Sequence, residues 1–300
     1  MHNKNYIGRF APSPTGPLHF GSLVTAIASY FQAKSQNGKW LVRMEDIDKD
    51  REQHGAASLI LKTLEAHHLF WDDTVIYQST RQHYYEHAIT KLDNLKKLYR
   101  CQCSRKTIRE SIVKYGYTEN VYPGTCRKLA LSAQQPHSLR ILVGKQTIKF
   151  NDTIQGMVTE EIQRQGDFVI RKVDGSVTYQ LAVAIDDALQ NITEVVRGVD
   201  LLDSCARQIL IMKLLNYPVP QYSHIPVLCH PDGSKLSKQT GAMAIENSGA
   251  ASHLWQALTY LNQNPPSALQ NATIEELHSW AIQNWSINKI SSKCNNLFYK

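Results

Sequence analysis

Apolar residues follow two different periods along the first hundred positions, and the pattern predicts strands and helices in turn. NYIGRF has the composition of a short strand, and after a loop rich in proline and glycine the apolar residues recur at helical spacing. The members of this helical face are Phe20, Leu23, Val24, Ile27, Ala28 and Phe31. KWLVRME predicts a strand buried on both faces, and helices are expected at 53–68 and from Thr80, a candidate N-cap, to Lys97. This order predicts a parallel sheet.

The pattern changes after this first part of the chain. From 101 to 166 the chain is rich in loops, with short strand-like pieces such as LRILV and TIKF, and we interpret it as an insertion. DFVIRKVDGSVTYQLAVAIDD predicts two strands joined at a DG turn. Helical spacing returns over 202–212 behind the candidate caps Asp200 and Asp203, and HIPVL is a further candidate strand. The remainder of the chain predicts helices with a break at NPPS.

Composition indicates a globular protein with a preference for anionic partners. The apolar share is 42% and the charged share 20% over 300 residues, which is enough to bury substantial cores. The formal net charge of +7 favours a polyanion such as nucleic acid, although solvated lysines produce the same excess. With no stretch suited to a membrane span or a signal peptide, we expect no membrane partner and a cytoplasmic location. Six cysteines then favour metal binding over a disulfide framework.

The loop ahead of the first predicted helix has the composition of a phosphate site. A helix N-terminus offers unpaired backbone N–H groups and a partial positive charge. Gly16 and Gly21 would let phosphates approach the backbone, and His19 can donate a hydrogen bond to a phosphate oxygen. Far along the chain, GSKLSKQTG carries Lys235 and Lys238, which can close over a polyphosphate. Taken singly, the two motifs also fit a proline-rich turn and a solvated basic loop.

Together these stretches resemble a known enzyme family. PLHFGS is similar to the HIGH motif, and KLSKQ to the KMSKS motif, of class I aminoacyl-tRNA synthetases. RFAPSPTGPLHFG, RMEDID, DGSVTYQLAVAIDD and VVRGVDLL narrow the resemblance to the glutamyl-tRNA synthetase branch, over almost the whole chain. Ser22 and Gln239 depart from the usual ends of the two motifs, as in the glutamyl-Q tRNA(Asp) synthetases. These short paralogues lack an anticodon-binding domain, and we expect none here, because the sequence ends near residue 300.

The resemblance implies an α/β fold with a Rossmann-like parallel sheet, a zinc-containing insertion and a small C-terminal helical region. The catalytic domain is expected at 1–97 and 177–245, the inserted RNA-contacting domain at 98–176 and the helical region at 246–300. The implied reaction is ATP-dependent activation of L-glutamate as glutamyl adenylate and its transfer to the queuosine wobble base of tRNA(Asp). The implied enzyme is a monomer that binds the anticodon stem-loop. A truncated glutamyl-tRNA synthetase that charges tRNA(Glu), and an inactive RNA-binding module, remain open alternatives.

The resemblance also implies which residues act on ATP. His19 and Lys238, with Lys235 in support, are expected to stabilise charge around the α-phosphate as pyrophosphate leaves. Mg²⁺ is expected to accompany the nucleotide. The expected ATP-binding residues are Gly16, His19, Gly21 and Lys238.

Two arginines and an acid are implied for the amino acid. Arg9 and Arg197 are expected to hold the carboxylates of glutamate, and Glu45 its ammonium group. An exposed acidic turn is the plain alternative for RMEDID, and a structural salt bridge is the alternative for Arg197. The expected glutamate-binding residues are Arg9, Phe10, Ala11, Pro12, Ser13, Glu45, Tyr179 and Arg197.

A group of cysteines in the insertion suggests a metal. Cys101, Cys103 and Cys126 have the spacing C-x-C-x18-Y-x3-C, and three thiols in a loop-rich segment favour structural Zn²⁺. The resemblance supplies Tyr122 as the fourth ligand, while a water or His137 is the alternative. Without zinc the three would be ordinary buried thiols.

Overall fold

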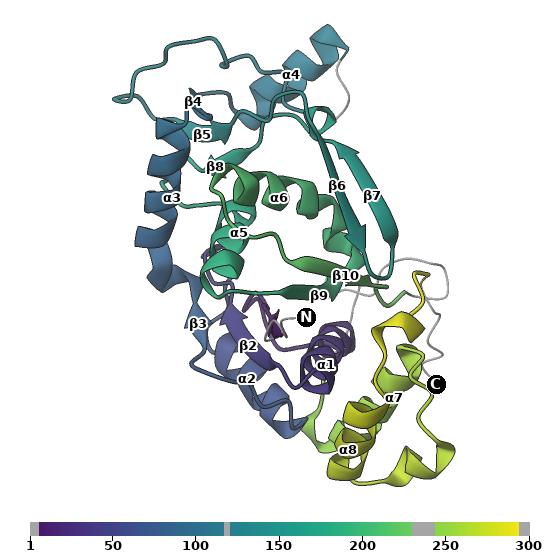
Figure 1. Cartoon of the computed structure of the whole chain (residues 1–300). Coiled ribbons are helices and arrows are strands. Elements are labelled where there is room, and N and C mark those ends of the chain that lie inside the picture. The colour runs from purple at the N-terminus through teal and green to yellow at the C-terminus, as the bar shows by residue number, and fades with distance from the viewer. Residues whose placement is uncertain (1–5, 117–120, 230–243, 294–300) are drawn as a thin grey trace.

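The chain folds around a parallel sheet flanked by helices, in a computed structural model that describes residues 6–116, 121–229 and 244–293 (Figure 1). Its first elements are β1 (Ile7–Phe10), α1 (Phe20–Ser35), β2 (Lys39–Met44), α2 (Ala56–Ala66), β3 (Ile76–Tyr77), α3 (Gln82–Asn94), β4 (Leu98–Cys101) and α4 (Arg105–Tyr115). The following elements are β5 (Ser138–Ile141), β6 (Thr147–Asp152), β7 (Gly156–Glu161), β8 (Val169–Arg171), α5 (Tyr179–Leu189), β9 (Glu194–Gly198), α6 (Cys205–Leu214), β10 (Gln221–Ile225), α7 (Ala250–Tyr260) and α8 (Ile274–Asn284). None of the helices in these segments has the length and apolar character needed to cross a membrane.

Two sets of parallel strands meet where β1 lies beside β9. β1, β2 and β3 pair in that order, and β9 pairs with β10. The backbone N–H of Thr193 donates to the carbonyl of Ile7 at 2.9 Å, which joins the two sets. In an open α/β sheet, ligands bind at such a switch point, outside the carboxyl ends of the strands. The predicted parallel sheet is therefore confirmed, and its topology places a site beside α1.

The helix α1 is buried on nearly all sides. Its predicted apolar face is confirmed, because every one of its six residues is buried. On its polar positions, Ser29 accepts a hydrogen bond from Trp40 Nε1 at 2.9 Å, and Gln32 accepts one from Trp285 Nε1 at 2.9 Å. The helix thus lies between the sheet and the C-terminal helices α7 and α8 (Figure 1). This packing holds its N-terminus rigidly at the sheet edge.

The stretch YQLAVAIDD lies in the helix α5, so the predicted second strand is wrong. The DG turn does exist, because Arg171 and Val177 form an antiparallel bridge around it before the chain enters the helix. All residues from Leu181 to Asp187 are buried. A run with no exposed face cannot be assigned to helix or strand from periodicity. Its acidic end is buried because the aspartates pair with arginines, as described below.

Three local predictions at helix ends are wrong. Thr80 does not cap α3 but lies in a preceding 3-10 turn, where its hydroxyl donates to the carbonyl of Tyr77 at 2.8 Å. Asp200 and Asp203 lie in a 3-10 helix before α6, which has no side-chain cap. The insertion also contains a helix that was not predicted, α4, which Ser104 caps. For Thr80, the carbonyl of Tyr77 is a closer partner than the end of the helix.

The segment interpreted as an insertion forms two structural units. β4, β5 and β8 make an antiparallel sheet beside α4 (Figure 1). The hairpin of β6 and β7 instead extends the main sheet, since Asp152 at the end of β6 pairs with Tyr222 of β10. This segment is therefore in direct contact with the main sheet. Its boundaries at 98 and 176 stay a prediction.

Histidines fill the contact between α2 and the C-terminal helices. His67 Nδ1 lies 2.7 Å from the carbonyl of Thr63, and its Nε2 lies 3.2 Å from Nδ1 of His253. His278 Nε2 lies 3.0 Å from the carbonyl of His67. Burial lowers the pKa of both His67 and His278 to about 4. Both rings are thus neutral at pH 7 and serve packing.

Candidate active site

A cavity of about 300 Å³ opens at the switch point between β1 and β9, beside the first turn of α1. Because β1 and β2 are parallel neighbours, residues at their carboxyl ends share this edge of the sheet. The predicted residues that line the cavity are Arg9, Phe10, Ala11, Pro12, Ser13, His19, Gly21, Glu45, Tyr179 and Arg197. Residues separated by most of the chain are therefore brought together, as the motifs predicted.

Among the described residues of the predicted ATP site, Gly16 is the one that does not line the cavity. Gly16 is buried, and its φ of 125° lies in the left-handed region that favours glycine, so it shapes the loop. Lys235 and Lys238 of GSKLSKQTG lie outside the described residues. The catalytic role of these two lysines stays a prediction.

His19 caps the helix that the loop leads into. Its Nδ1 accepts the backbone N–H of Ser22 at 3.3 Å, so in the neutral ring the proton resides on Nε2. Gly21 leaves space for this ring, because a Cβ there would lie 3.1 Å from His19 Cε1. The head of α1 therefore combines an imidazole with the positive end of the helix dipole, an arrangement that suits an anion.

A buried ion-pair network lies between β1, β2 and α5. Arg9 donates to Asp187 through Nε at 3.1 Å and through Nη2 at 3.3 Å. Arg43, which is fully buried, lies 2.9 Å from Asp187 and 3.3 Å from Glu45. Arg9 and Glu45 thus have protein partners that orient them before any ligand binds. Sequence reasoning missed Arg43 and Asp187. Each is a charged residue within a largely apolar stretch, which is a signal that could have predicted a buried ion pair.

The two carboxylates of this network differ in their readiness to ionise. Burial raises the pKa of Glu45 to about 6, despite the opposing effect of Arg43 and Arg9. Burial also disfavours ionisation of Asp187, but the charges of Arg9 and Arg43 outweigh it and lower the pKa of Asp187. A further cation, such as an ammonium group, would therefore stabilise the ionised form of Glu45 more than that of Asp187.

Arg197 lies on the wall of the cavity, and all its direct partners are neutral. It is buried, with 4% of its surface exposed. Its Nε donates to His224 Nε2 at 3.0 Å, its Nη1 to the Tyr179 hydroxyl at 3.4 Å and its Nη2 to the Leu201 carbonyl at 3.3 Å. No carboxylate in the described part of the chain forms an ion pair with it. A buried guanidinium in this setting favours an anion supplied by a ligand.

A second cavity of about 200 Å³ adjoins the first and shares Ser13, Glu45 and Tyr179 with it. Asp48 and Arg51 pair at 2.7 Å on its wall. The other residues that line it are Ile47, Gln78, Lys172, Val177 and Thr178. The side-chain oxygen of Gln78 is buried and lacks a hydrogen-bond partner within the described structure. The combined site therefore has room for two ligands that meet beside Ser13, Glu45 and Tyr179, the residues that both cavities share.

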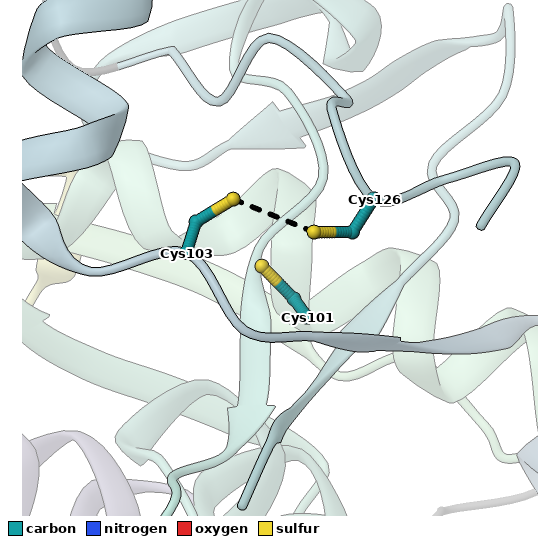
Figure 2. Close-up of side chains that lie close together, drawn as sticks. All are labelled: Cys101, Cys103 and Cys126. Carbon is teal, nitrogen blue, oxygen red and sulfur yellow. Dashed lines mark hydrogen bonds between the residues drawn. The ribbon is translucent and has the colours of Figure 1, made fainter. Parts of the chain in front are cut away.

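Three thiols converge in the insertion at the end of β4 (Figure 2). The Sγ atoms of Cys101, Cys103 and Cys126 all lie within 4.8 Å of one another, and those of Cys103 and Cys126 are 3.4 Å apart. Zinc–sulfur bonds of about 2.3 Å in a tetrahedron hold sulfurs about 3.8 Å apart, so this spacing suits one zinc ion. Burial opposes the thiolate of Cys101, but the hydrogen-bond contacts with Tyr122 and Arg140 outweigh it and lower the pKa of Cys101.

Tyr122 is the side chain best placed to complete the cysteine group. Its hydroxyl lies 3.4 Å from Cys101 Sγ and 3.6 Å from Cys103 Sγ, and it accepts the backbone N–H of Cys126 at 2.9 Å. His137, the alternative, stands outside this group, and its Nδ1 lies 2.7 Å from a backbone carbonyl. The donor set of three sulfurs and one oxygen fits a structural zinc site.

The remaining cysteines take no part in this cluster. Cys205 is fully buried, and its Sγ accepts a hydrogen bond from Arg197 Nη2 at 2.9 Å, which places it behind the cavity wall. Cys229 is disulfide-bonded. Cys101, Cys103, Cys126 and Cys205 are free, so the described residues show no disulfide framework. Cys294 lies outside the described residues.

Comparison with known structures reveals the same fold in a larger enzyme. The chain superposes with a TM-score of 0.84, at 23% identity, on a glutamate tRNA ligase from Elizabethkingia meningosepticum crystallised in complex with its amino acid. The match covers 98% of this chain and 67% of that chain. At this level of identity, the likeness concerns the fold alone.

Sequence comparison identifies the family. The family described as "tRNA synthetases class I (E and Q), catalytic domain" matches residues 7–261. The "Glutamyl-Q tRNA(Asp) synthetase" of Vibrio vulnificus (strain CMCP6) is 45% identical over 97% of this chain and 93% of its own length. The relative of the same name from Dechloromonas aromatica (strain RCB) is 46% identical over 96% of each chain. The chain therefore belongs to the class I tRNA synthetases of the glutamate and glutamine type, in the glutamyl-Q tRNA(Asp) synthetase family.

Proposed function

We propose that this chain activates L-glutamate with ATP and transfers the glutamate to the queuosine wobble base of tRNA(Asp). The names of its relatives support this reaction, and membership of the class I synthetases supports the use of ATP. The observation that carries the proposal is the environment of Arg197. This guanidinium is buried on the wall of the cavity and contacts only neutral groups, so a carboxylate of the substrate would supply its counterion.

The proposed binding of glutamate uses opposite charges on opposite walls. Arg197 and the remaining N–H groups of Arg9 hold the carboxylates, and Glu45 accepts the ammonium group. Ser13 and Tyr179 complete the pocket. The pairs that Arg9 and Glu45 already form with their neighbours support this arrangement, because they fix both side chains and reduce the entropy cost of binding.

Activation joins a glutamate carboxylate oxygen to the α-phosphorus of ATP, while the bond to pyrophosphate breaks. Such a step depends mainly on alignment and on fixed positive charge. We assign these tasks to the Nε2–H of His19 and to the backbone N–H groups at the head of α1, near Gly21. Mg²⁺ bound with ATP would neutralise phosphate charge, and Lys238 and Lys235 would act in the same way.

The second cavity suits the nucleoside that receives the glutamate. A hydroxyl of the queuosine cyclopentene ring must reach the activated carbonyl carbon. We assign this carbon to the region where the two cavities share Glu45 and Tyr179. Asp48 and the buried oxygen of Gln78 offer acceptors for ring hydroxyls. We therefore assign the second cavity to the modified base.

The remaining features of the proposal concern the metal, the RNA and the setting. Cys101, Cys103, Cys126 and Tyr122 would hold Zn²⁺ and thereby fix the fold of the insertion. The net charge of +7 favours a bound anticodon stem-loop. We propose that the enzyme acts as a monomer in the cytoplasm, where its tRNA substrate resides.

Labelled glutamate tests this proposal directly. The chain is incubated with ATP and labelled glutamate, together with tRNA(Asp) that contains queuosine, tRNA(Asp) without queuosine, or tRNA(Glu). We expect label on the first tRNA alone. Label on tRNA(Glu) alone would identify a glutamyl-tRNA synthetase, and no label together with no glutamate-dependent pyrophosphate exchange would identify an inactive module.

Arg197→Ala ties the reaction to the residue that carries the proposal. We expect this change to abolish glutamate-dependent pyrophosphate exchange, because the substrate carboxylate loses its buried partner. Arg207→Ala is the matched control, since Arg207 lies over the ring of Phe168 and does not line the cavity. Equal activity of the two variants would contradict the assignment.

A further inference from the structure

A chain of three buried polar side chains runs from the insertion to the wall of the glutamate cavity. Asp152 ends β6, His224 lies in β10 and Arg197 in β9. His224 Nδ1 lies 2.5 Å from Asp152 Oδ2, and His224 Nε2 lies 3.0 Å from Arg197 Nε. All three residues are buried, with 4% or less of their surface exposed.

The hydrogen bonds fix the protonation state of the imidazole. Arg197 Nε–H can only donate, so His224 Nε2 must accept and carries no proton. The single proton of the neutral ring then lies on Nδ1 and is donated to Asp152. Burial lowers the pKa of His224, although the contact with Asp152 favours the charged ring. One tautomer is therefore enforced from both sides.

Asp152 is itself held by the backbone. Its Oδ1 accepts the N–H groups of Ile154 at 3.0 Å and of Gln155 at 2.9 Å. The Gln155 side chain donates in turn to the carbonyl of His224 at 2.8 Å. The turn between β6 and β7 therefore clamps β10 and fixes both ends of the carboxylate contact.

We propose that Asp152 and His224 are positioning residues for the carboxylate-binding guanidinium of Arg197, an inference that rests on the proposed binding of glutamate. His224 holds the Nε edge of the guanidinium, so that the planar group cannot rotate away from the cavity. The negative charge of Asp152 reaches Arg197 only through the neutral ring. It thus stabilises the buried cation without occupying the position that the substrate carboxylate needs.

The inference assigns a role in the amino-acid site to the insertion. Asp152 belongs to the hairpin of β6 and β7, and Figure 1 shows this hairpin beside β10. The hairpin therefore completes the glutamate subsite from behind, from a segment of the chain that lines neither cavity.

Asp152→Asn tests the arrangement with a nearly isosteric side chain. If the amide oxygen stays with the backbone N–H groups, the amide nitrogen faces His224 Nδ1 and forces the proton onto Nε2. The Nε2–H of His224 and the Nε–H of Arg197 would then be two donors that face each other. We expect the Kd of L-glutamate, measured by calorimetry, to rise by about 10- to 100-fold, the range for loss of a hydrogen bond to a charged group. The Kd of ATP should change by less than about twofold.

Two substitutions of His224 guard against a variant that fails to fold. His224→Gln keeps an acceptor near the position of Nε2, whereas His224→Leu removes it. We expect the glutamine variant to retain part of the affinity for glutamate that the leucine variant loses. Ser223→Ala is the matched control, because Ser223 is equally buried in β10 but donates to Glu194 on the opposite face.

The possible results separate this inference from the proposed function. Selective loss of glutamate affinity in Asp152→Asn and His224→Leu, with partial rescue in His224→Gln, would support it. Unchanged glutamate affinity, or an equal loss for glutamate and ATP, would overturn it while the wild-type reaction stands. A wild-type chain that binds no glutamate would overturn the proposed function instead.

Discussion

The carboxylate of Glu45 makes a quantitative prediction about the binding of glutamate. In the free protein, burial raises the pKa of Glu45 to about 6. The ammonium group of the substrate requires the ionised form, so affinity should be constant above pH 7 and fall as the pH drops through 6. At pH 5 about one tenth of the molecules carry the ionised form, so the apparent Kd should rise about tenfold from pH 8 to pH 5, or about 1.4 kcal/mol.

The substrate itself contributes little in this range. The side-chain carboxyl of glutamate has an ordinary pKa of about 4.3. The ammonium group of a free amino acid is more basic than a peptide N-terminus and stays protonated up to pH 8. Replacement of Glu45 by Gln removes the titrating group and the charge-assisted contact. We therefore expect Glu45→Gln to weaken binding at pH 8 by about 1.5–3 kcal/mol and to abolish the pH dependence between pH 5 and 8.

Calorimetric titration of L-glutamate at pH 5, 6, 7 and 8 measures both effects. Glu194→Gln is the matched control, because Glu194 is also a buried acid whose pKa burial raises, but it pairs with Ser223 and Gln32 away from the cavity. Its pH profile should follow the wild type. A flat wild-type profile, or a slope that persists in Glu45→Gln, would refute the assignment of the ammonium group to Glu45.

Three further predictions concern other parts of the molecule. Cys101→Ser should remove zinc, measured by metal analysis, and destabilise the insertion while glutamate-dependent pyrophosphate exchange continues; a metal-free wild type would rule the site out. Asp48→Ala should slow transfer to tRNA by about tenfold or more and leave pyrophosphate exchange unchanged. Asp50→Ala is the control outside the second cavity and should leave both rates unchanged. His67 and His278, with pKa values of about 4 in the fold, bind protons more readily when unfolded, so stability should fall by about 2 kcal/mol for each between pH 7.5 and pH 5. Urea unfolding at pH 7.5 and pH 5 measures this change in the free energy of unfolding. Equal stability at the two pH values would count against buried neutral rings.

The sequence alone determined the elements whose signals are local. The apolar period of α1, the loop with its prolines and glycines and the strand ending in RMEDID all predict structure from neighbouring residues. From these signals the parallel sheet could be predicted, and the motifs placed Arg9, Glu45 and His19 at one site. The spacing of Cys101, Cys103 and Cys126 also anticipated a cluster that the structure confirms.

Only the tertiary structure decided how the charges pair. The neighbouring sequence gives no sign of the distant side chains that pair with Arg43, Asp187 and Asp152. The helix α5 was misassigned for the same reason, since a segment buried on all sides loses the alternation that periodicity detects. Electrostatic interactions in a low-dielectric interior depend on distances of a few ångströms between remote segments, and only the folded chain sets those distances.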